Sequence, residues 1–369
     1  MFGEGGKPLT RMSTPREVRS LALADLDSDG CHDIVAGLTD GFMVVWGKLR
    51  PGEKPLVKYP PRRQVGEGFG SSVAAYKNTL VVGAPNDDPH APGSGVVYVY
   101  TFTGHRPGPP KRITQNSPGV VGNSEKNDNF GWAVAAGDFG GGPGVDIVVG
   151  APGESTDGPG ASPATTEDTA RVSGVPNAGA VTVLFDPLTA RPRSTKFVHA
   201  QGRTAGARFG HSLAVGNRDD ESYLLAGVPG ADAVEVISLN GEPRPYSTLT
   251  SPKRGVMFGH SLALADGRAV VGAPRADGAR GNVSIHLLDP GAPPRIVQPQ
   301  GRPGDRFGWA VTVGPGLRVT ASAPGRRAPE ALAHRAGSGA ITHFRLDDPR
   351  PGPWWYPPTP DVRFGEVVR

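Results

Sequence analysis

A short stretch near the N-terminus carries the residue types best suited to chemistry. Asp25, Asp27, Asp29, Gly30 and Asp33 form the pattern D-x-D-x-D-G-x-x-D between two apolar runs. Carboxylates at alternate positions of a loop can converge on one hard cation such as Ca²⁺, as in the first half of an EF-hand loop. The glycine permits the sharp turn that folds such a loop back over the ion.

The stretch differs from an EF-hand in its second half. The twelfth loop position, where a bidentate Glu belongs, is Ala36, and the flanks Leu21–Ala24 and Ile34–Ala36 are typical of short strands. A metal-free polar turn is the alternative, but four acids so close together would repel one another without a cation. We therefore predict a calcium site whose ligands are Asp25, Asp27, Asp29, Cys31 through its carbonyl oxygen, and Asp33.

The elements that must position this loop recur along the chain. The dipeptide Phe-Gly occurs at Phe69, Phe130, Phe209, Phe258, Phe307 and Phe364. Each of the first five is followed by Gly-Ala-Pro or a near copy, such as Gly83–Pro85, and then by a β-rich run, such as Val96–Tyr100. The opening segment fits the same frame, with Glu17 and Val18 in place of Phe-Gly.

Each unit is predicted to contain a strand, a hairpin, a strand, a turn and a third strand, and then a looser stretch that holds a fourth strand, for example at Arg112–Thr114 or Tyr246–Thr250. Four-stranded units of this length are typical of propeller blades. We predict an all-β propeller over residues 17–369 after a tail at 1–16. Six complete repeats start near 17, 69, 130, 209, 258 and 307, and a partial seventh starts at 364. The Phe is expected to wedge between neighbouring sheets.

Repeat 3 contains a weaker candidate metal loop. Its Phe and Gly-Ala-Pro positions, 130 and 150, are spaced like positions 17 and 37 of the first repeat, which leaves room for a loop of equal length. The aligned positions are Asp138, Gly140, Gly142 and Asp146. Because two of the four carboxylates are missing, Asp138 and Asp146 form only a weaker second site, and a glycine-rich hairpin is the alternative.

Composition excludes several classes of function. The 39 basic and 35 acidic residues are scattered, which argues against nucleic-acid binding. One cysteine excludes an intrachain disulfide framework. No apolar run is long enough to span a membrane, and no signal peptide is visible at the start. The nine histidines form no metal motif, and the two G-H-S-L-A segments are interpreted as repeated structure, so we predict no catalytic residues and no cofactor other than Ca²⁺.

Three insertions follow Gly-Ala-Pro or its variant, at Asn86–Gly95, Gly153–Gly179 and Gly325–Gly339. All three should lie on one face of the propeller. Repeat proteins place variable loops on the binding face, although an unspecialised surface is the alternative.

The motif set resembles the FG-GAP repeats of integrin alpha-subunit-like β-propellers, including bacterial ones. The resemblance implies that the aspartate loop binds calcium between the first two strands of a blade. It also implies an extracellular or secreted binding or adhesion module that is not an enzyme and engages protein or glycan ligands. The alternatives are a secreted hydrolase, the accessory propeller of a hydrolase, or an intracellular scaffold. The first repeat departs from the family by lacking Phe-Gly, and the family usually has seven blades. The oligomeric state is not predicted.

Overall fold

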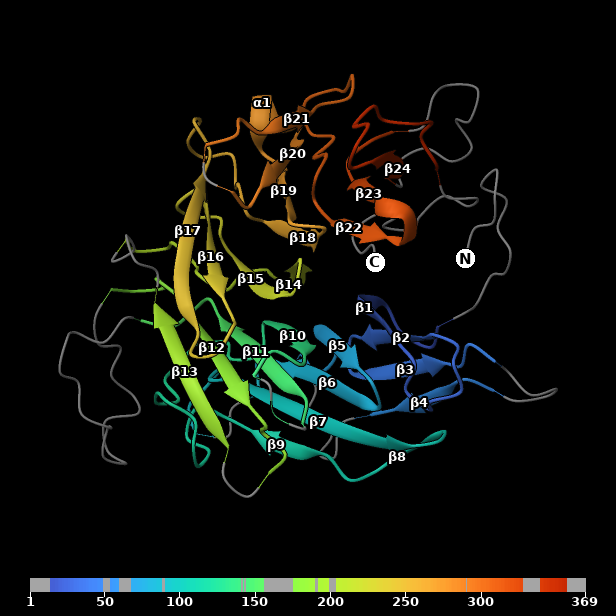
Figure 1. Ribbon diagram of the computed structural model, residues 1–369, viewed down its shortest axis with the longest axis vertical. Coiled ribbons are helices and arrows are strands. Elements are labelled where there is room, and N and C mark those ends of the chain that lie inside the picture. The colour runs from blue at the N-terminus through green and yellow to red at the C-terminus, as the bar shows by residue number, and fades with distance from the viewer. Residues whose placement is uncertain are drawn as a thin grey trace.

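The chain folds into six antiparallel sheets arranged around a central axis (Figure 1). A computed structural model describes residues 14–48, 54–59, 68–87, 90–140, 142, 144–155, 175–189, 192–198, 204–289, 291–327 and 339–356. These residues are almost entirely strands and turns, which confirms the prediction of an all-β propeller. No helix among them is long and apolar enough to cross a membrane.

Each sheet is one blade, and its strands run outwards from the axis in chain order. Blade 1 contains β1 (Val18–Ala24), β2 (Asp33–Leu38), β3 (Gly41–Val45) and β4 (Leu56–Lys58). Blade 2 contains β5 (Ser72–Tyr76), β6 (Thr79–Ala84), β7 (Val96–Thr103), β8 (Arg106–Pro107) and β9 (Lys111–Ile113). Blade 3 contains β10 (Ala133–Gly137), β11 (Asp146–Ala151), β12 (Ala180–Phe185) and β13 (Arg193–Val198).

The second half of the ring repeats this order. Blade 4 contains β14 (Leu213–Arg218), β15 (Glu221–Val228), β16 (Ala233–Ser238) and β17 (Arg244–Thr250). Blade 5 contains β18 (Ser261–Ala265), β19 (Arg268–Ala273), β20 (Asn282–Leu287) and β21 (Arg295–Val297), with the short α1 (Ala276–Ala279) between β19 and β20. Blade 6 contains β22 (Val311–Gly314), β23 (Arg318–Ala323) and β24 (Ala340–Arg345), with a 3-10 turn at Pro315–Leu317.

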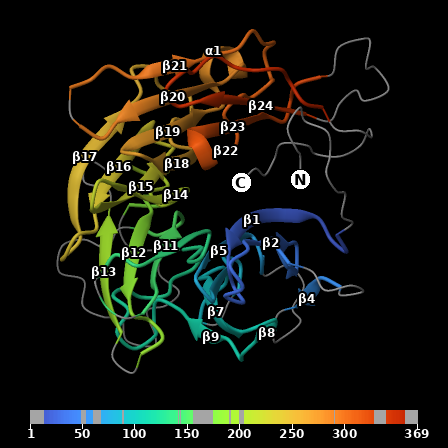
Figure 2. The same cartoon turned by 45° about the vertical axis from the view of Figure 1, so that its right-hand side comes forward.

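The fourth strands are the most variable part of the blades. The predicted fourth strands of repeats 2 and 4 are present as β9 and β17. In the described part of blade 6, the fourth-strand position is represented by Trp355, whose backbone pairs with Ile341 of β24. The innermost strands β1, β5, β10, β14, β18 and β22 pack against one another in this order around the axis (Figures 1 and 2).

The phenylalanine of each repeat lies between two blades, as the sequence predicts. Phe69 is buried and stacks on Phe42 of blade 1 with the ring centroids 6.4 Å apart, and it meets the edge of Tyr98 of blade 2 at 5.2 Å. Phe130, Phe209 and Phe307 are equally buried, and each pairs through its backbone with the glycine that precedes the third strand of the previous blade. The wedge therefore joins blades by apolar contact and by backbone pairing.

A glycine and a serine form a second joint between blades. A Cβ atom added at Gly83, in the Gly-Ala-Pro of blade 2, would lie 2.0 Å from the carbonyl oxygen of Gly131, the Phe-Gly glycine of blade 3. The Ser72 hydroxyl donates a 2.8 Å hydrogen bond to the same oxygen. Ser20, Ser212 and Ser261 donate the equivalent bonds in blades 1, 4 and 5.

Blade 6 shows no such joint among the residues that the structure describes. Its Gly-Ala-Pro glycine is replaced by Ser322, and the serine of its inner strand is replaced by Ala310. The Ser322 hydroxyl instead accepts a 3.0 Å hydrogen bond from the Ala310 amide. The structure shows six sheets, and the predicted partial seventh repeat at Phe364 lies outside the described residues.

Candidate metal centre and axial cavity

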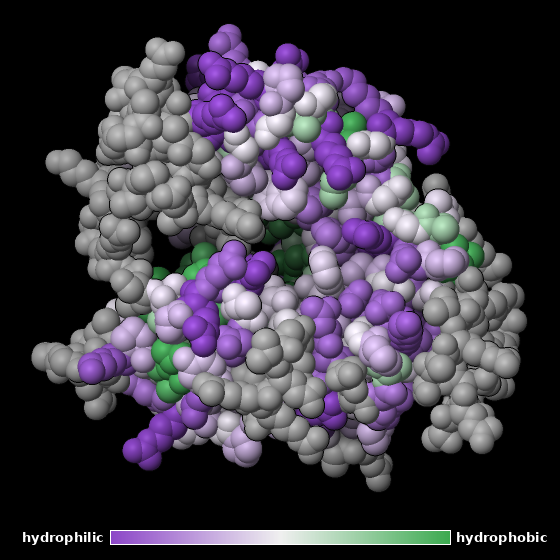
Figure 3. Space-filling model, turned by 180° about the vertical axis from the view of Figure 1, so that it is seen from behind, coloured by the Kyte–Doolittle hydropathy of each residue, from purple (hydrophilic) through white to green (hydrophobic). Residues whose placement is uncertain are grey.

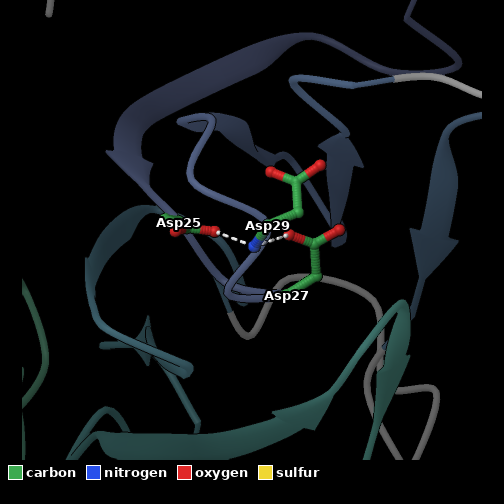
Figure 4. Close-up of side chains that lie close together, drawn as sticks. All are labelled: Asp25, Asp27 and Asp29. Atoms are coloured by element: carbon green, nitrogen blue, oxygen red, sulfur yellow. Dashed lines mark hydrogen bonds between the residues drawn. The ribbon is translucent and has the colours of Figure 1, made fainter.

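The predicted metal loop connects β1 to β2 at the end of blade 1 opposite the Phe-Gly turns. The β1–β2 ladder ends at the pair Ala24 and Asp33, so the loop spans residues 25–32. Asp25, Asp27 and Asp29 converge there, with ligand oxygens that all lie within 4.8 Å of one another (Figure 4). Oxygens on opposite sides of a Ca²⁺ ion lie about 5 Å apart, so this spacing suits one such ion.

Backbone amides of the loop hold these carboxylates in place. The Asp29 N–H donates to Oδ1 of Asp25 at 3.0 Å and to Oδ1 of Asp27 at 3.2 Å. The Gly30 N–H donates to Oδ2 of Asp25, and the Cys31 N–H donates to Oδ1 of Asp29. Gly30 has a φ of +87°, which a residue with a side chain rarely adopts. Hydrogen bonds from the loop's own backbone therefore hold the three carboxylates close together.

Asp33 lies outside the group of three carboxylates. It is fully buried, and its two oxygens accept 2.8 Å hydrogen bonds from the Leu26 and Gly47 amides. Burial raises the pKa of Asp33, while these two N–H groups oppose the shift. The carboxylate braces the loop against the end of β3. Direct coordination by Asp33 and by the carbonyl of Cys31, an exposed residue, stays a prediction.

His105 is a residue of this site that sequence reasoning missed. It lies at the tip of the β7–β8 hairpin of blade 2, and its Nε2 lies 2.7 Å from Oδ2 of Asp27. Its ring stacks on Trp46 with the centroids 4.2 Å apart and an interplanar angle of 8°. Blade 2 thus contributes to the blade 1 loop. The sequence around His105 does not indicate a contact with Asp27, because the two residues lie far apart in the chain.

The weaker second site does not assemble a comparable group. Asp138 forms an ion pair with Lys77 at 3.3 Å. Asp146 is buried and accepts hydrogen bonds from the Phe139, Gly140 and Asp186 amides, so it is the structural counterpart of Asp33. Within the described ranges, the Asp25 cluster is the sole group of three or more metal-binding side chains this close together. Metal binding in repeat 3 therefore has no third carboxylate to support it.

A cavity of about 400 Å³ runs along the axis and is lined by the inner strands of all six blades. Its wall contains many small residues, among them Ala22, Ala74, Ala135, Ala214 and Ala263, which leave the space open. Figure 3 shows a hollow near the centre of one face, with hydrophobic residues at its floor.

Four aromatic side chains form a continuous arc at one end of the axis, and we call them the aromatic arc: Trp132, His211, His260 and Trp309. Each immediately follows a Phe-Gly dipeptide. The centroid distances along the arc are 5.7, 5.0 and 4.5 Å. From the sequence, we expected the two G-H-S-L-A segments to be repeated structure only. The missed signal was that a residue after Phe-Gly begins an inner strand and so faces the axis.

Both histidines of the arc are neutral at neutral pH. Burial, the neighbouring His260 and the charge of Arg208 lower the pKa of His211 to about 3. Burial and the charge of Arg275 lower the pKa of His260 to about 4. The Nδ1 atoms of both rings are buried and have no hydrogen-bond partner among the described residues. Buried polar atoms without a hydrogen-bond partner are uncommon in native proteins and call for an explanation.

A separate buried cluster lies where blades 2 and 3 meet. Glu154 accepts hydrogen bonds from Gln115 at 2.5 Å and from Lys196 at 2.6 Å. Asp128 is buried beside it and accepts a 2.6 Å hydrogen bond from the Glu125 amide. Burial and the charges of Glu154 and Glu125 raise the pKa of Asp128 to about 8. Asp128 is therefore largely protonated at neutral pH.

This cluster predicts a loss of stability between acidic and mildly alkaline pH that one substitution relieves. Because folding raises the pKa of Asp128 to about 8, the stability it contributes is complete below the pKa of an unfolded aspartate, about 4, and is lost as the pH rises from there to about 8. In urea unfolding, the stability of Asp128→Asn relative to wild type should therefore increase by ~4 kcal/mol between pH 5 and pH 9. The exposed Asp138→Asn serves as control. An Asp128→Asn effect that is equal at both pH values would contradict the assignment.

Comparison with known proteins agrees with this architecture. A family model for the FG-GAP repeat matches residues 64–100, which include the Phe-Gly and Gly-Ala-Pro of blade 2. No curated protein matches the chain. The fold is similar to that of BBS1N in complex with ARL6DN, with a TM-score of 0.51, 12% identity, and coverage of 96% of this chain and 85% of that chain.

The chain is also similar to the dihydro-heme d1 dehydrogenase NirN in complex with DHE. The TM-score is 0.49 at 13% identity, and the match covers 95% of this chain and 59% of that one. The chain thus spans less than two thirds of the length of NirN, and identities this low concern the fold alone. The six successive blades show that the chain is a six-bladed β-propeller, and the family match shows an FG-GAP repeat in blade 2.

Proposed function

We propose that this protein is a calcium-stabilised, non-enzymatic binding module that works outside the cell and engages protein or glycan ligands through one face of the propeller. The observation that carries the proposal is the convergence of Asp25, Asp27 and Asp29 in a hairpin loop ordered by its own amides. Calcium sites of extracellular modules are built from such oxygen ligands and tolerate partial exposure.

The residues of the loop fit a structural ion. Asp25 and Asp27 are partly buried and Asp29 is exposed, so the ligands lie at the surface of blade 1. Asp33 holds the base of the loop and His105 holds Asp27 from blade 2. A bound ion would neutralise the repulsion among the three carboxylates and thereby stabilise the β1–β2 hairpin and its contact with blade 2.

The binding face is the opposite one. The Phe-Gly turns precede the inner strands, and the Gly-Ala-Pro turns follow the second strands, so both lie at the same end of every blade. The described ends of two insertions support this placement, because the Gly153 amide donates to the Asp128 carbonyl and the Gly325 amide donates to the Asp305 carbonyl. Metal and ligand would thus occupy opposite faces of the ring.

Calcium should raise the thermal stability of the protein. We expect calorimetry to show a melting temperature several degrees higher with added Ca²⁺ than with chelator, since an ion that binds only the folded state stabilises it by mass action. Asp27→Ala should remove the difference. Asp40→Ala, which removes an exposed acid of the same blade that pairs with Arg16, should keep it. Identical melting of the wild type under both conditions would refute the calcium assignment.

Ligand binding is tested by probing glycan and protein arrays with the calcium-loaded protein, beside a panel of hydrolase substrates. Binding without turnover is the expected result. Turnover that depends on a residue of the axial cavity would favour the hydrolase alternative and refute the proposal.

A further inference from the structure

The aromatic arc lies at the centre of the proposed binding face. Its members are the residues after Phe-Gly, so they stand at the end of the inner strands where the Phe-Gly turns and the insertions also lie. Trp132 is 40% exposed although it is the largest kind of apolar side chain. Trp132, His211 and His260 line the axial cavity, and Trp309 contacts His260 beside it. An exposed aromatic wall beside a cavity is a common feature of ligand sites.

Positive charge surrounds the arc. Arg208 lies close enough to His211, and Arg275 to His260, to lower the pKa of each imidazole. The guanidinium carbon of Arg306 lies 5.5 Å from the centre of the Trp309 ring. These three arginines are exposed, and none forms an ion pair with a residue that the structure describes.

Three of the acidic residues described at the same end are engaged or neutral. Asp232 accepts hydrogen bonds from the Gly255 and Phe258 amides. Asp305 pairs with Arg326 at 2.9 Å. Asp128 is largely protonated at neutral pH because of its raised pKa. The three exposed arginines beside the arc therefore favour an anionic ligand.

The arc also offers polar atoms. The buried Nδ1 atoms of His211 and His260 point away from solvent, which leaves Nε2 as the atom that each neutral ring can present as donor or acceptor. Ser71, the counterpart of Trp132 in blade 2, adds a hydroxyl to the wall of the cavity. A ligand with several hydroxyl groups would find matching partners here.

We propose that the aromatic arc binds a six-membered sugar ring that carries a carboxylate, such as a uronic acid at the end of a glycan. Neighbouring rings of the arc are tilted by 37°, 34° and 55°, so the wall is curved and suits a puckered sugar better than a flat aromatic ligand. The C–H face of the sugar stacks on Trp132, its hydroxyls bond to the two histidines, and Arg208 and Arg306 attract its carboxylate. The cavity volume is within the usual range for small-ligand sites.

This inference rests on the proposed function and narrows it, because it assigns the ligand to acidic glycans and the site to the axis. The test is calorimetric titration of the calcium-loaded protein with an oligosaccharide that ends in glucuronic acid and with its glucose-terminated counterpart. Only the acidic probe should bind well. Trp132→Ala should weaken its binding about 10-fold or more, and Arg208→Gln about 5-fold. Tyr246→Ala, which removes an equally exposed aromatic from β17, should leave it unchanged.

The outcomes separate the two proposals. Equal affinity for both probes, or binding that survives Trp132→Ala, would overturn the axial site. If the acidic probe fails to bind while a protein or another glycan from the arrays binds, the axial site falls and the proposed function stands. If no array ligand binds at all, the proposed function fails as well. Each variant is checked by its circular dichroism and by its calcium-dependent melting, so that loss of folding is not mistaken for loss of affinity.

Discussion

Gly150→Ala is expected to destabilise the propeller by about 3 kcal/mol, because it forces a carbon atom into the backbone of the next blade. A Cβ atom at residue 150 would lie 2.1 Å from the carbonyl oxygen of Gly210 and 3.0 Å from its carbonyl carbon. Backbone atoms at this joint cannot give way as a flexible side chain can. Blades 3 and 4 would have to separate, which would also loosen the packing of Phe209 between them.

The measurement is urea unfolding of the variant and of Gly314→Ala as the matched control. A Cβ atom at residue 314 would meet nothing nearer than 3.9 Å, and its φ of −105° is open to any residue. The control should therefore stay within about 1 kcal/mol of wild type. Similar stability of the two variants would show that the close approach of Gly150 and Gly210 does not hold the blades together.

Acid should unfold the protein well before its ordinary carboxylates are protonated. Burial lowers the pKa of His211 to about 3 and the pKa values of His260 and His286 to about 4. The same side chains have pKa values near 6.5 in an unfolded chain. The unfolded state therefore binds more protons at these three sites, and the stability they contribute above pH 6.5 is lost as the pH falls through this range.

Asp128 acts in the opposite direction between pH 5 and 6.5. It is protonated in the folded state and ionised in the unfolded state, so it offsets about one of the three histidine protons. The net difference of about two protons corresponds to a fall of up to ~3 kcal/mol per pH unit near pH 5.

Urea unfolding between pH 7 and pH 5 measures this slope. His211→Gln should make it shallower by about one proton, whereas His32→Gln, which alters an exposed histidine, should leave it unchanged. A flat profile in the wild type, or an equal slope in both variants, would show that the buried histidines are not the source of the acid sensitivity.

The sequence by itself determined the fold and the position of the metal loop. Phe-Gly, Gly-Ala-Pro and the following β-rich run recur in a constant order, and each motif specifies local geometry that needs no distant partner. The alternation of Asp25, Asp27 and Asp29 with Gly30 is equally local, and these three carboxylates do converge. The wedge of Phe69 between blades was predictable because a large apolar residue beside a glycine has few other places to pack.

The tertiary structure alone decided what surrounds these motifs, because it joins residues from different blades. Asp33 and Asp146 are both buried and accept hydrogen bonds from nearby amides, which the sequence pattern alone did not indicate. His105 reaches Asp27 from another blade, and Ser322 replaces the glycine of a joint that five other blades retain. The aromatic arc forms because one residue from each of four repeats lies near the axis. The sequence of a single repeat does not indicate that these four side chains are close together.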